Sequence, residues 1–311
     1  MHVLGIDAGG TKTVCLLADQ TGAILSEGRG GGANLQASGE LEVEKVLHEV
    51  MERALGDRDE IRPSAICLGI AGVDRQRDAD AIRGIMRRIG FKSRVLVVND
   101  ALIALTAGVG DESGLVVIAG TGSIAYGRKG HRAARSGGWG YLLGDEGGGF
   151  WIGRAALSAV VRQFDGRGPS TQLTDLVLRN MHLHSPTELI HAIYDRGLQR
   201  HAVAGIAAVV REASETGDAV ATEILGRAAT ELGAAASAVV QTLGMRGSIF
   251  RTVLAGGIFR AIPTLADAVT LRLSEIAPRT SVELLQIEPA IGAVHLALTA
   301  ARGEATIPQY L

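Results

Sequence analysis

The spacing of hydrophobic and polar positions along this 311-residue chain predicts an α/β protein. Short apolar runs bounded by glycine predict strands, and apolar positions that recur every three or four residues predict helices. The predicted strands cover residues 3–7, 13–18, 23–25, 65–71, 94–98, 114–119, 124–128, 131–136, 253–258 and 282–285. The predicted helices cover residues 39–55, 76–89, 150–163, 186–195, 199–215, 219–243, 263–276 and 290–300, with an Ala/Leu-rich helix after Asp100.

The order of these elements indicates an internal duplication. Residues 3–25 predict three strands joined by turns, the first of which is rich in glycine. Residues 114–136 repeat this arrangement roughly a hundred residues later, with the turn at Gly120–Ser123. Two such segments predict two similar domains, each with a hairpin able to face a phosphate.

Neither glycine turn fits the two common nucleotide-binding motifs. Gly5–Thr13 nearly spells a Walker loop, but Thr11 separates the second glycine from Lys12. A strand, not the required helix, then follows. Gly120–Ala125 fails as a dinucleotide fingerprint because a strand follows there too. Successive N–H groups from Gly9 to Thr11 can still bind an anion, with Lys12 assisting.

Polar side chains follow two of the predicted strands. Asp7 lies at the end of the first strand and could hold a magnesium ion through a bound water. Asn99 and Asp100 follow the strand 94–98, and α/β sheets bind ligands at the carboxyl ends of their strands. Asp100 could alternatively be no more than the N-cap of the next helix.

The segment Gly137–Gly149 is the most unusual stretch of the chain. Seven of its residues are glycine, and they surround Trp139 and the pair Asp145-Glu146. A flexible linker carries little aromatic mass, whereas glycine next to Trp and carboxylate indicates close approach to a ligand or positive φ angles. The alternative is a tight turn before the predicted helix. Glu146 is either a site residue or a carboxylate in the first helical turn.

The composition excludes several classes of function. A hydrophobic content of 47% supports sizeable cores, and a net charge of −2 gives no electrostatic reason to expect nucleic acid or an anionic membrane as partner. No apolar run approaches membrane-spanning length. Cys15 and Cys67 lie in apolar strand-like runs, which predicts buried, reduced thiols. We therefore expect a cytoplasmic protein without nucleic-acid or membrane partners.

Four motifs together resemble one family. They are Gly5-Ile-Asp-Ala-Gly-Gly-Thr-Lys-Thr13, Asn99-Asp-Ala101, Ala119-Gly-Thr-Gly-Ser123 and the Gly-Gly-Trp-Gly…Asp-Glu-Gly run at 137–147. In this order they resemble the N-acetylglucosamine kinase branch of the BadF/BadG/BcrA/BcrD ATPase family, in the actin-like ATPase and sugar kinase superfamily. The resemblance covers nearly the whole chain, and the tryptophan-containing run is its most specific part.

This resemblance implies an α/β fold of two ribonuclease-H-like (actin/hexokinase-like ATPase) domains flanking a cleft. The first domain would comprise residues 1–110 with the C-terminal helix 290–311. The second would comprise residues 111–289, with helical insertions. Sugar and ATP would bind in the cleft, whose closure excludes water. A homodimer is a further expectation of the resemblance.

The resemblance also implies roles for single residues. Asp100 would be the catalytic base that contacts the attacking sugar hydroxyl, and Asp7 would organise Mg²⁺. The residues expected to hold the sugar, besides Asp100, are Asn34, Gly138, Trp139 and Asp145. The residues expected to hold ATP are Gly10, Thr11, Lys12, Thr121, Gly122, Gly256 and Gly257. These residue types suit phosphoryl transfer, which needs mainly positioning and charge neutralisation.

The implied reaction is the ATP-dependent phosphorylation of an amino-sugar hydroxyl. The favoured substrate is N-acetylglucosamine, which would be converted to its 6-phosphate. Glucosamine, N-acetylmuramic acid or another hexose are alternatives, and Ala71 stands where some family members have serine. An activator ATPase with a bridging iron–sulfur cluster would need suitably placed thiolates, which Cys15 and Cys67 do not suggest. A sugar-responsive regulator without kinase activity is the remaining alternative.

Overall fold

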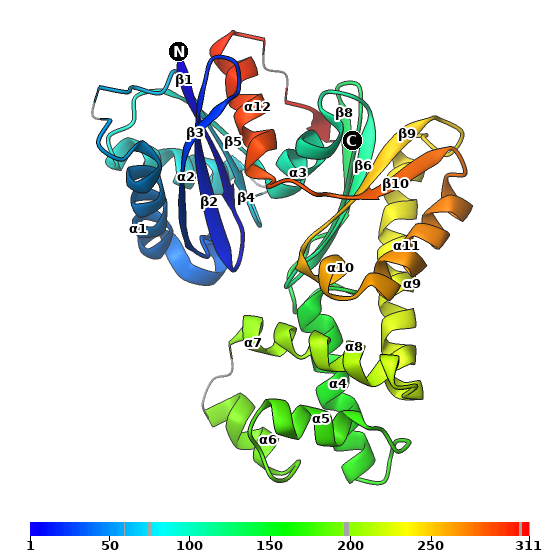
Figure 1. The fold of residues 1–311 in the computed structure, drawn as a ribbon. Helices are drawn as coiled ribbons and strands as arrows, with labels where there is room; N and C mark the ends of the chain where they lie inside the picture. Colours follow the sequence, from blue (N-terminus) through cyan, green and yellow to red (C-terminus); the bar gives the residue numbers. More distant parts are fainter. Residues whose placement is uncertain (59, 74–75, 196–198, 305–306, 311) are drawn as a thin grey trace. The chain divides into compact units, whose positions relative to one another are not determined.

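The computed structural model describes residues 1–58, 60–73, 76–195, 199–304 and 307–310, which form two compact units. The first unit comprises Met1–Val116, Tyr126–Ala134 and Glu283–Leu311, and the second comprises Val117–Ala125 and Arg135–Val282. The side chains of residues 36–38 and 310 lie outside the description. Figure 1 shows the elements of both units, coloured along the chain.

A five-stranded sheet forms the centre of the first unit. Its order is β3-β2-β1-β4-β5, formed by Ile24–Gly31, Lys12–Asp19, His2–Ala8, Ala65–Ile70 and Arg94–Asn99. β2 runs antiparallel to both neighbours, whereas β1, β4 and β5 run parallel. This mixed order confirms the predicted ribonuclease-H-like arrangement. Parallel strands need crossover helices, so both faces of the sheet are covered.

Four helices cover this sheet. They are α1 (Leu35–Leu55), α2 (Gln76–Arg88), α3 (Asp100–Val109) and α12 (Ala290–Ala301). α1 and α2 pack on one face and enclose the main apolar core, which includes Leu4, Ile66 and Ile82. α12 and α3 pack on each other and on the sheet (Figure 1). The C-terminal helix therefore returns to the first strand of the chain.

The second sheet repeats the strand order of the first. It is ordered β10-β9-β6-β7-β8-β11. Its strands are Thr280–Leu284, Phe250–Ala255, Gly114–Ala119, Ser123–Lys129, Arg132–Gly137 and Gln309–Tyr310, in that order. Read from β8 to β10, it matches β3-β2-β1-β4-β5, which confirms the predicted duplication. β11 was not predicted, and it pairs with β8 at the sheet edge.

The remaining helices belong to the second unit. They are α4 (Gly149–Phe164), α5 (Leu173–Asn180), α6 (Glu188–Ile190) with a π-helical turn at His191–Asp195, α7 (Arg200–Gly205), α8 (Ala207–Glu215), α9 (Ala219–Thr242), α10 (Gly257–Ala261) and α11 (Pro263–Ile276). α9 packs against α11 and α8, and α4 packs against α7 (Figure 1). The short α5 was not predicted from the sequence. The predicted helix 199–215 is divided into two helices at Ile206.

Several element boundaries differ from the prediction, and two of them lie near the first glycine hairpin. Gly30 and Gly31 lie beyond the strand predicted at residues 23–25 but belong to β3, where they pair with Thr13 and Lys12 of β2. The hydroxyl of Thr13 also donates a hydrogen bond to the Gly31 carbonyl (2.7 Å), which fixes the end of the strand. The helix expected from residue 39 begins at Leu35, with a break at Gly39 where φ is 77°.

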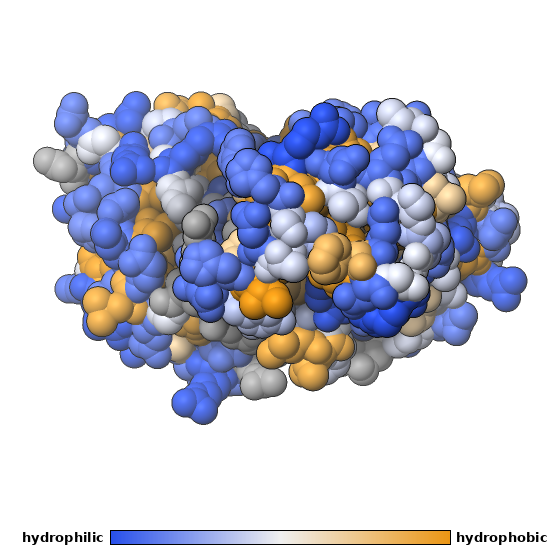
Figure 2. Space-filling model, turned by 90° about the horizontal axis from the view of Figure 1, so that it is seen from below, coloured by the Kyte–Doolittle hydropathy of each residue, from blue (hydrophilic) through white to orange (hydrophobic). Residues whose placement is uncertain are grey.

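In the described part of the chain, no helix is both long and apolar enough to span a bilayer. On the face shown in Figure 2, hydrophobic side chains lie in small groups among hydrophilic ones. Cys15 and Cys67 are buried and unbridged thiols, as predicted, and burial raises the pKa of both.

Candidate functional site

Two carboxylates meet at the ends of the parallel strands in the first unit. Asp7, near the end of β1, is buried, and Asp100 begins α3 directly after β5. Burial and, to a smaller extent, the neighbouring charge of Asp100 raise the pKa of Asp7 to about 7, although the charge of Lys12 opposes the shift. The positive charge near Asp7 is therefore too small to offset the burial of its carboxylate.

The N-cap of α3 is Asn99 and not Asp100. The Asn99 side chain accepts a hydrogen bond from the N–H of Ala101 (2.8 Å). Asp100 is the first helical residue and is half-buried. The alternative in which Asp100 serves only as the N-cap is therefore wrong, because its neighbour already fills that position.

The first glycine hairpin uses one of its own N–H groups. Gly9 donates to the carbonyl of Lys12 (3.0 Å), so the expected contribution of the Gly9 N–H to anion binding is wrong. Gly10 and Thr11 are exposed at the tip. The segment before Asn34 lies against this hairpin, because Ala33 donates its N–H to the Gly9 carbonyl (3.0 Å).

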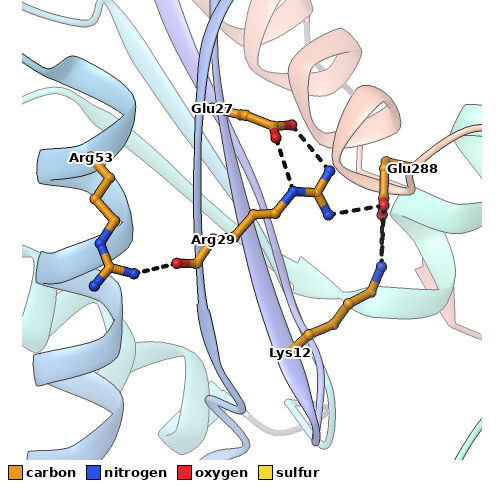
Figure 3. A network of polar contacts seen from close by, with 5 residues as sticks. All are labelled: Lys12, Glu27, Arg29, Arg53 and Glu288. Carbon is orange, nitrogen blue, oxygen red and sulfur yellow. Dashed lines mark hydrogen bonds and ion pairs between the residues drawn. The ribbon is translucent and has the colours of Figure 1, made fainter.

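Lys12 takes part in a network of charges (Figure 3). Its ammonium group pairs with Glu288 at 2.9 Å, and Arg29 contacts the same carboxylate at 3.3 Å while also pairing with Glu27. Burial alone would raise the pKa of Glu288, but the hydrogen bonds from Lys12 and Arg29 outweigh it and lower the pKa. Glu288 precedes Pro289, the N-cap of α12, so this network ties the hairpin to the C-terminal helix.

The second glycine hairpin is joined to the start of α4. The N–H of Gly149 donates to the carbonyl of Gly120 (2.8 Å), and the N–H of Phe150 donates to that of Thr121 (2.9 Å). These are two of the N–H groups that a helix leaves without a partner in its first turn. Gly256 is adjacent, since a Cβ there would lie 2.2 Å from the Ala119 carbonyl oxygen.

Ser123 connects this hairpin to the Gly137–Gly149 segment. Its carbonyl accepts a hydrogen bond from the Gly138 N–H (2.9 Å), and its hydroxyl donates to the Glu146 carbonyl (2.6 Å). The sequence analysis did not assign a role to Ser123. Its position directly after the Gly-Thr-Gly turn was the only signal. The expected positive φ angles occur at Gly138 (71°) and at Gly137 (78°).

Asp145 lies directly on the second hairpin. Its φ is 61°, and its carboxylate accepts a hydrogen bond from the Gly140 N–H (3.2 Å). A Cβ on Gly122 would lie 2.3 Å from the Asp145 Oδ2 atom, so only glycine lets this carboxylate approach the backbone there. Burial raises the pKa of Asp145, while backbone hydrogen bonds and Arg200 oppose the shift.

Glu146 is not a first-turn helix residue. α4 begins at Gly149, with Gly148 as its N-cap, and its first turn holds no acidic residue. That alternative is wrong because the glycine turn delays the helix by three residues. The Glu146 side chain is exposed.

Arginine side chains stack on the aromatic rings of the Gly137–Gly149 segment. Arg135 lies over the Trp139 ring at 4.7 Å, and Arg200 lies over the Tyr141 ring at 5.0 Å. Phe150 contacts Tyr141 edge-on, with 5.2 Å between the ring centroids. Trp139 is 60% exposed. The aromatic rings are thus fixed in place, and the face of Trp139 remains partly accessible.

The first unit fits the Mg²⁺ that its family resemblance implies. Asp7 is a buried carboxylate with excess negative charge around it, and Mg²⁺ prefers one or two carboxylates together with substrate phosphates and water. Within the described residues, no group of three or more His, Cys, Asp or Glu side chains forms a dedicated metal cage. Asp7 would hold the ion, which would neutralise phosphate charge when bound.

The predicted residues thus form two groups, one in each unit. The first unit holds Asp7, Gly10, Thr11, Lys12, Asn34 and Asp100. The second unit holds Thr121, Gly122, Gly138, Trp139, Asp145, Gly256 and Gly257. The first group offers carboxylates and a cation, and the second offers glycine backbone, a carboxylate and an aromatic ring. Their roles in binding and catalysis stay predictions.

Comparisons with known proteins identify relatives along the whole chain. Residues 4–297 match the BadF/BadG/BcrA/BcrD ATPase family. The chain is 39% identical over 299 residues to the N-acetylmuramic acid/N-acetylglucosamine kinase of Clostridium acetobutylicum, covering 95% of this chain and 98% of that protein. It is 32% identical to the N-acetyl-D-glucosamine kinase of Dictyostelium discoideum, covering 95% of this chain and 97% of that protein.

A solved structure confirms the predicted fold class. The crystal structure of a putative N-acetylglucosamine kinase from Chromobacterium violaceum superimposes with a TM-score of 0.76 at 26% identity, covering 96% of this chain and 98% of that chain. Together with the repeated strand order, this match supports two ribonuclease-H-like halves.

Proposed function

The chain belongs to the BadF/BadG/BcrA/BcrD ATPase family, and we propose that it is the kinase that transfers the γ-phosphoryl group of ATP to the 6-hydroxyl of N-acetylglucosamine. Two relatives that are 39% and 32% identical over nearly their whole length are amino-sugar kinases. These relatives support an ATP-dependent amino-sugar kinase. The choice of N-acetylglucosamine and of its 6-hydroxyl is our proposal.

The observation that carries the mechanism is the position of Asp100. Its neighbour Asn99 caps the N-terminus of α3, so the Asp100 carboxylate is not needed as the helix N-cap. A carboxylate next to the acceptor hydroxyl can accept its proton late in phosphoryl transfer, without a raised pKa. General-base assistance of this kind is typically worth about 100- to 10,000-fold in rate.

The other residues have supporting roles in this proposal. Asn34, Gly138, Trp139 and Asp145 bind the sugar. The hairpin residues Gly10, Thr11, Lys12, Thr121 and Gly122 bind the phosphates. Gly256 and Gly257 approach the adenosine. Asp7 would hold Mg²⁺, which would neutralise charge at the phosphates when bound. The close contact of Asp145 with Gly122 supports coupling between sugar and phosphate binding.

Several accompanying expectations belong to the same proposal. Domains of residues 1–110 with 290–311 and of residues 111–289 would flank a cleft that binds sugar and ATP. The enzyme would be a cytoplasmic homodimer. Size-exclusion chromatography with light scattering tests the oligomeric state.

An ADP-release screen with Mg-ATP tests the reaction. The sugars would be N-acetylglucosamine, N-acetylmuramic acid, glucosamine, N-acetylmannosamine and glucose. We expect the highest kcat/KM with an N-acetylated glucosamine, and ³¹P–¹H correlation of the product should place the phosphate on carbon 6. ADP release that no sugar stimulates would contradict the proposal and favour an activator ATPase or a regulator.

A further inference from the structure

Two arginines from outside the Gly137–Gly149 segment lie against its aromatic rings, and a neutral sugar does not require them. Arg135 and Arg200 both lie on its aromatic rings, at 4.7 Å and 5.0 Å. Sugar hydroxyls are bound well by carboxylates and backbone groups, which Asp145 and the glycines already offer. A guanidinium group is suited instead to planar anions, which it binds with two parallel hydrogen bonds.

Arg200 is the better candidate of the two arginines for a ligand. Arg135 already donates a hydrogen bond to the Gly137 carbonyl (2.8 Å). Within the described residues, Arg200 stacks on Tyr141 and influences Asp145 electrostatically, but it makes no hydrogen bond or ion pair. Stacking occupies the face of the guanidinium and leaves its in-plane N–H groups directed outward.

The position of Arg200 is fixed by packing. It is the first residue of α7, which lies against the start of α4. The backbones approach so closely that a Cβ on Gly153 would lie 1.9 Å from the Val203 carbonyl oxygen. The Tyr141 ring below Arg200 is held edge-on by Phe150. Such a preorganised cation loses little entropy when it binds an anion.

Arg200 also lies on the sugar side of the second unit. It is near enough to Asp145 to oppose the rise in the pKa of that carboxyl group. Asp145 and Glu146 would repel a negatively charged sugar, so an acidic acceptor needs a cation at this edge. The relative from Clostridium acetobutylicum is an N-acetylmuramic acid/N-acetylglucosamine kinase. These two sugars differ by a lactyl ether that bears a carboxylate.

We propose that Arg200 forms a subsite for the carboxylate of an acidic amino sugar, so that this kinase accepts N-acetylmuramic acid as well as N-acetylglucosamine. The inference rests on the proposed function. Arg200 is a specificity-determining residue in this view. It contacts the lactyl carboxylate and takes no part in the transfer of the phosphoryl group.

The test compares kcat/KM for the two sugars in three proteins. These are the wild type, Arg200→Met and the control Arg227→Met. Arg227 likewise stacks on an aromatic ring, that of Trp151 at 5.3 Å, but lies on α9 outside the sugar segment. We expect Arg200→Met to lower kcat/KM for N-acetylmuramic acid at least about tenfold, as is typical for the loss of a charge-assisted hydrogen bond. The kcat/KM of Arg200→Met for N-acetylglucosamine should change less than about threefold, and Arg227→Met should leave kcat/KM unchanged for both sugars.

A modified substrate separates recognition from a structural effect. The amide of the lactyl group removes the negative charge from the sugar. Wild-type protein should use this amide about as poorly as Arg200→Met uses the acid, and the variant should not distinguish acid from amide. An equal loss with both natural sugars would overturn the inference and assign Arg200 to the phosphates or to folding.

Failure of the inference can be told from failure of the proposed function. Turnover of N-acetylglucosamine without turnover of N-acetylmuramic acid in the wild type would overturn the carboxylate subsite alone. Absence of turnover with every sugar would overturn both.

Discussion

Replacing Asp7 by asparagine should make the ligand-free protein more stable, and the gain should grow with pH. Asp7 is buried at the end of β1, where burial and the charge of Asp100 raise its pKa from 3.8 to about 7. The folded state therefore holds a proton that the unfolded state releases at lower pH. The contribution of Asp7 to the free energy of unfolding is therefore fully present below about pH 3.8 and is lost as the pH rises through 7.

The size of the effect follows from the two pKa values. One pKa unit corresponds to about 1.4 kcal/mol, so ionisation of Asp7 costs the folded state about 4 kcal/mol above pH 8. Between pH 5 and pH 8 the wild type should lose about 3 kcal/mol from this group. Asparagine does not titrate, so the stability difference between Asp7→Asn and wild type should rise by that amount over the same interval.

Urea unfolding at pH 5 and pH 8, with EDTA and without nucleotide, measures this difference. Asp57→Asn serves as a control, because it removes an exposed carboxylate instead of a buried one. Mg-ATP should then stabilise the wild type more than Asp7→Asn, if Asp7 holds the ion. A stability difference that does not change between pH 5 and pH 8 would refute the argument.

Three further substitutions test the packing and the charge network. Gly292→Ala should lower the free energy of unfolding by about 1–3 kcal/mol or more, because its Cβ would lie 2.0 Å from a carbonyl oxygen of α3. Gly226→Ala in α9 should instead raise the free energy of unfolding by about 0.5–1 kcal/mol, because its Cβ would meet open space. Urea unfolding of both variants checks this, and equal effects would contradict it. Glu288→Gln should cost less than about 1 kcal/mol, because solvent reaches both pairs: the Lys12 and Arg29 side chains are about half exposed and that of Glu288 is 32% exposed. Unfolding at low and high salt measures it, and a loss of several kcal/mol would show that the network matters more to stability than its exposure suggests.

Local patterns were enough to predict most elements and their order. The apolar runs of β4 and β6 and the glycine turns are readable from a few adjacent residues, and the duplication follows from their repetition. Short elements were harder to predict from the sequence. α5 has too few turns to show a period, and β11 exists only because it pairs with β8.

The site was predictable in its residue types but not in its contacts. Asp100 was identified from its place after a strand, yet the capping role of Asn99 required the structure. Lys12 pairs with Glu288, 276 positions away, and no local pattern encodes such a contact. The bond between Ser123 and the Glu146 carbonyl is of the same kind, because it depends on how the chain closes over itself.

The most direct test of the kinase mechanism is the turnover of Asp100→Asn. The control is Asp111→Asn, an exposed residue just beyond the other end of α3. We expect Asp100→Asn to keep its folded structure and its affinity for the sugar, while kcat falls about 100-fold or more and Asp111→Asn stays near wild type. Near-normal turnover of Asp100→Asn would contradict the assignment of Asp100 as the catalytic base.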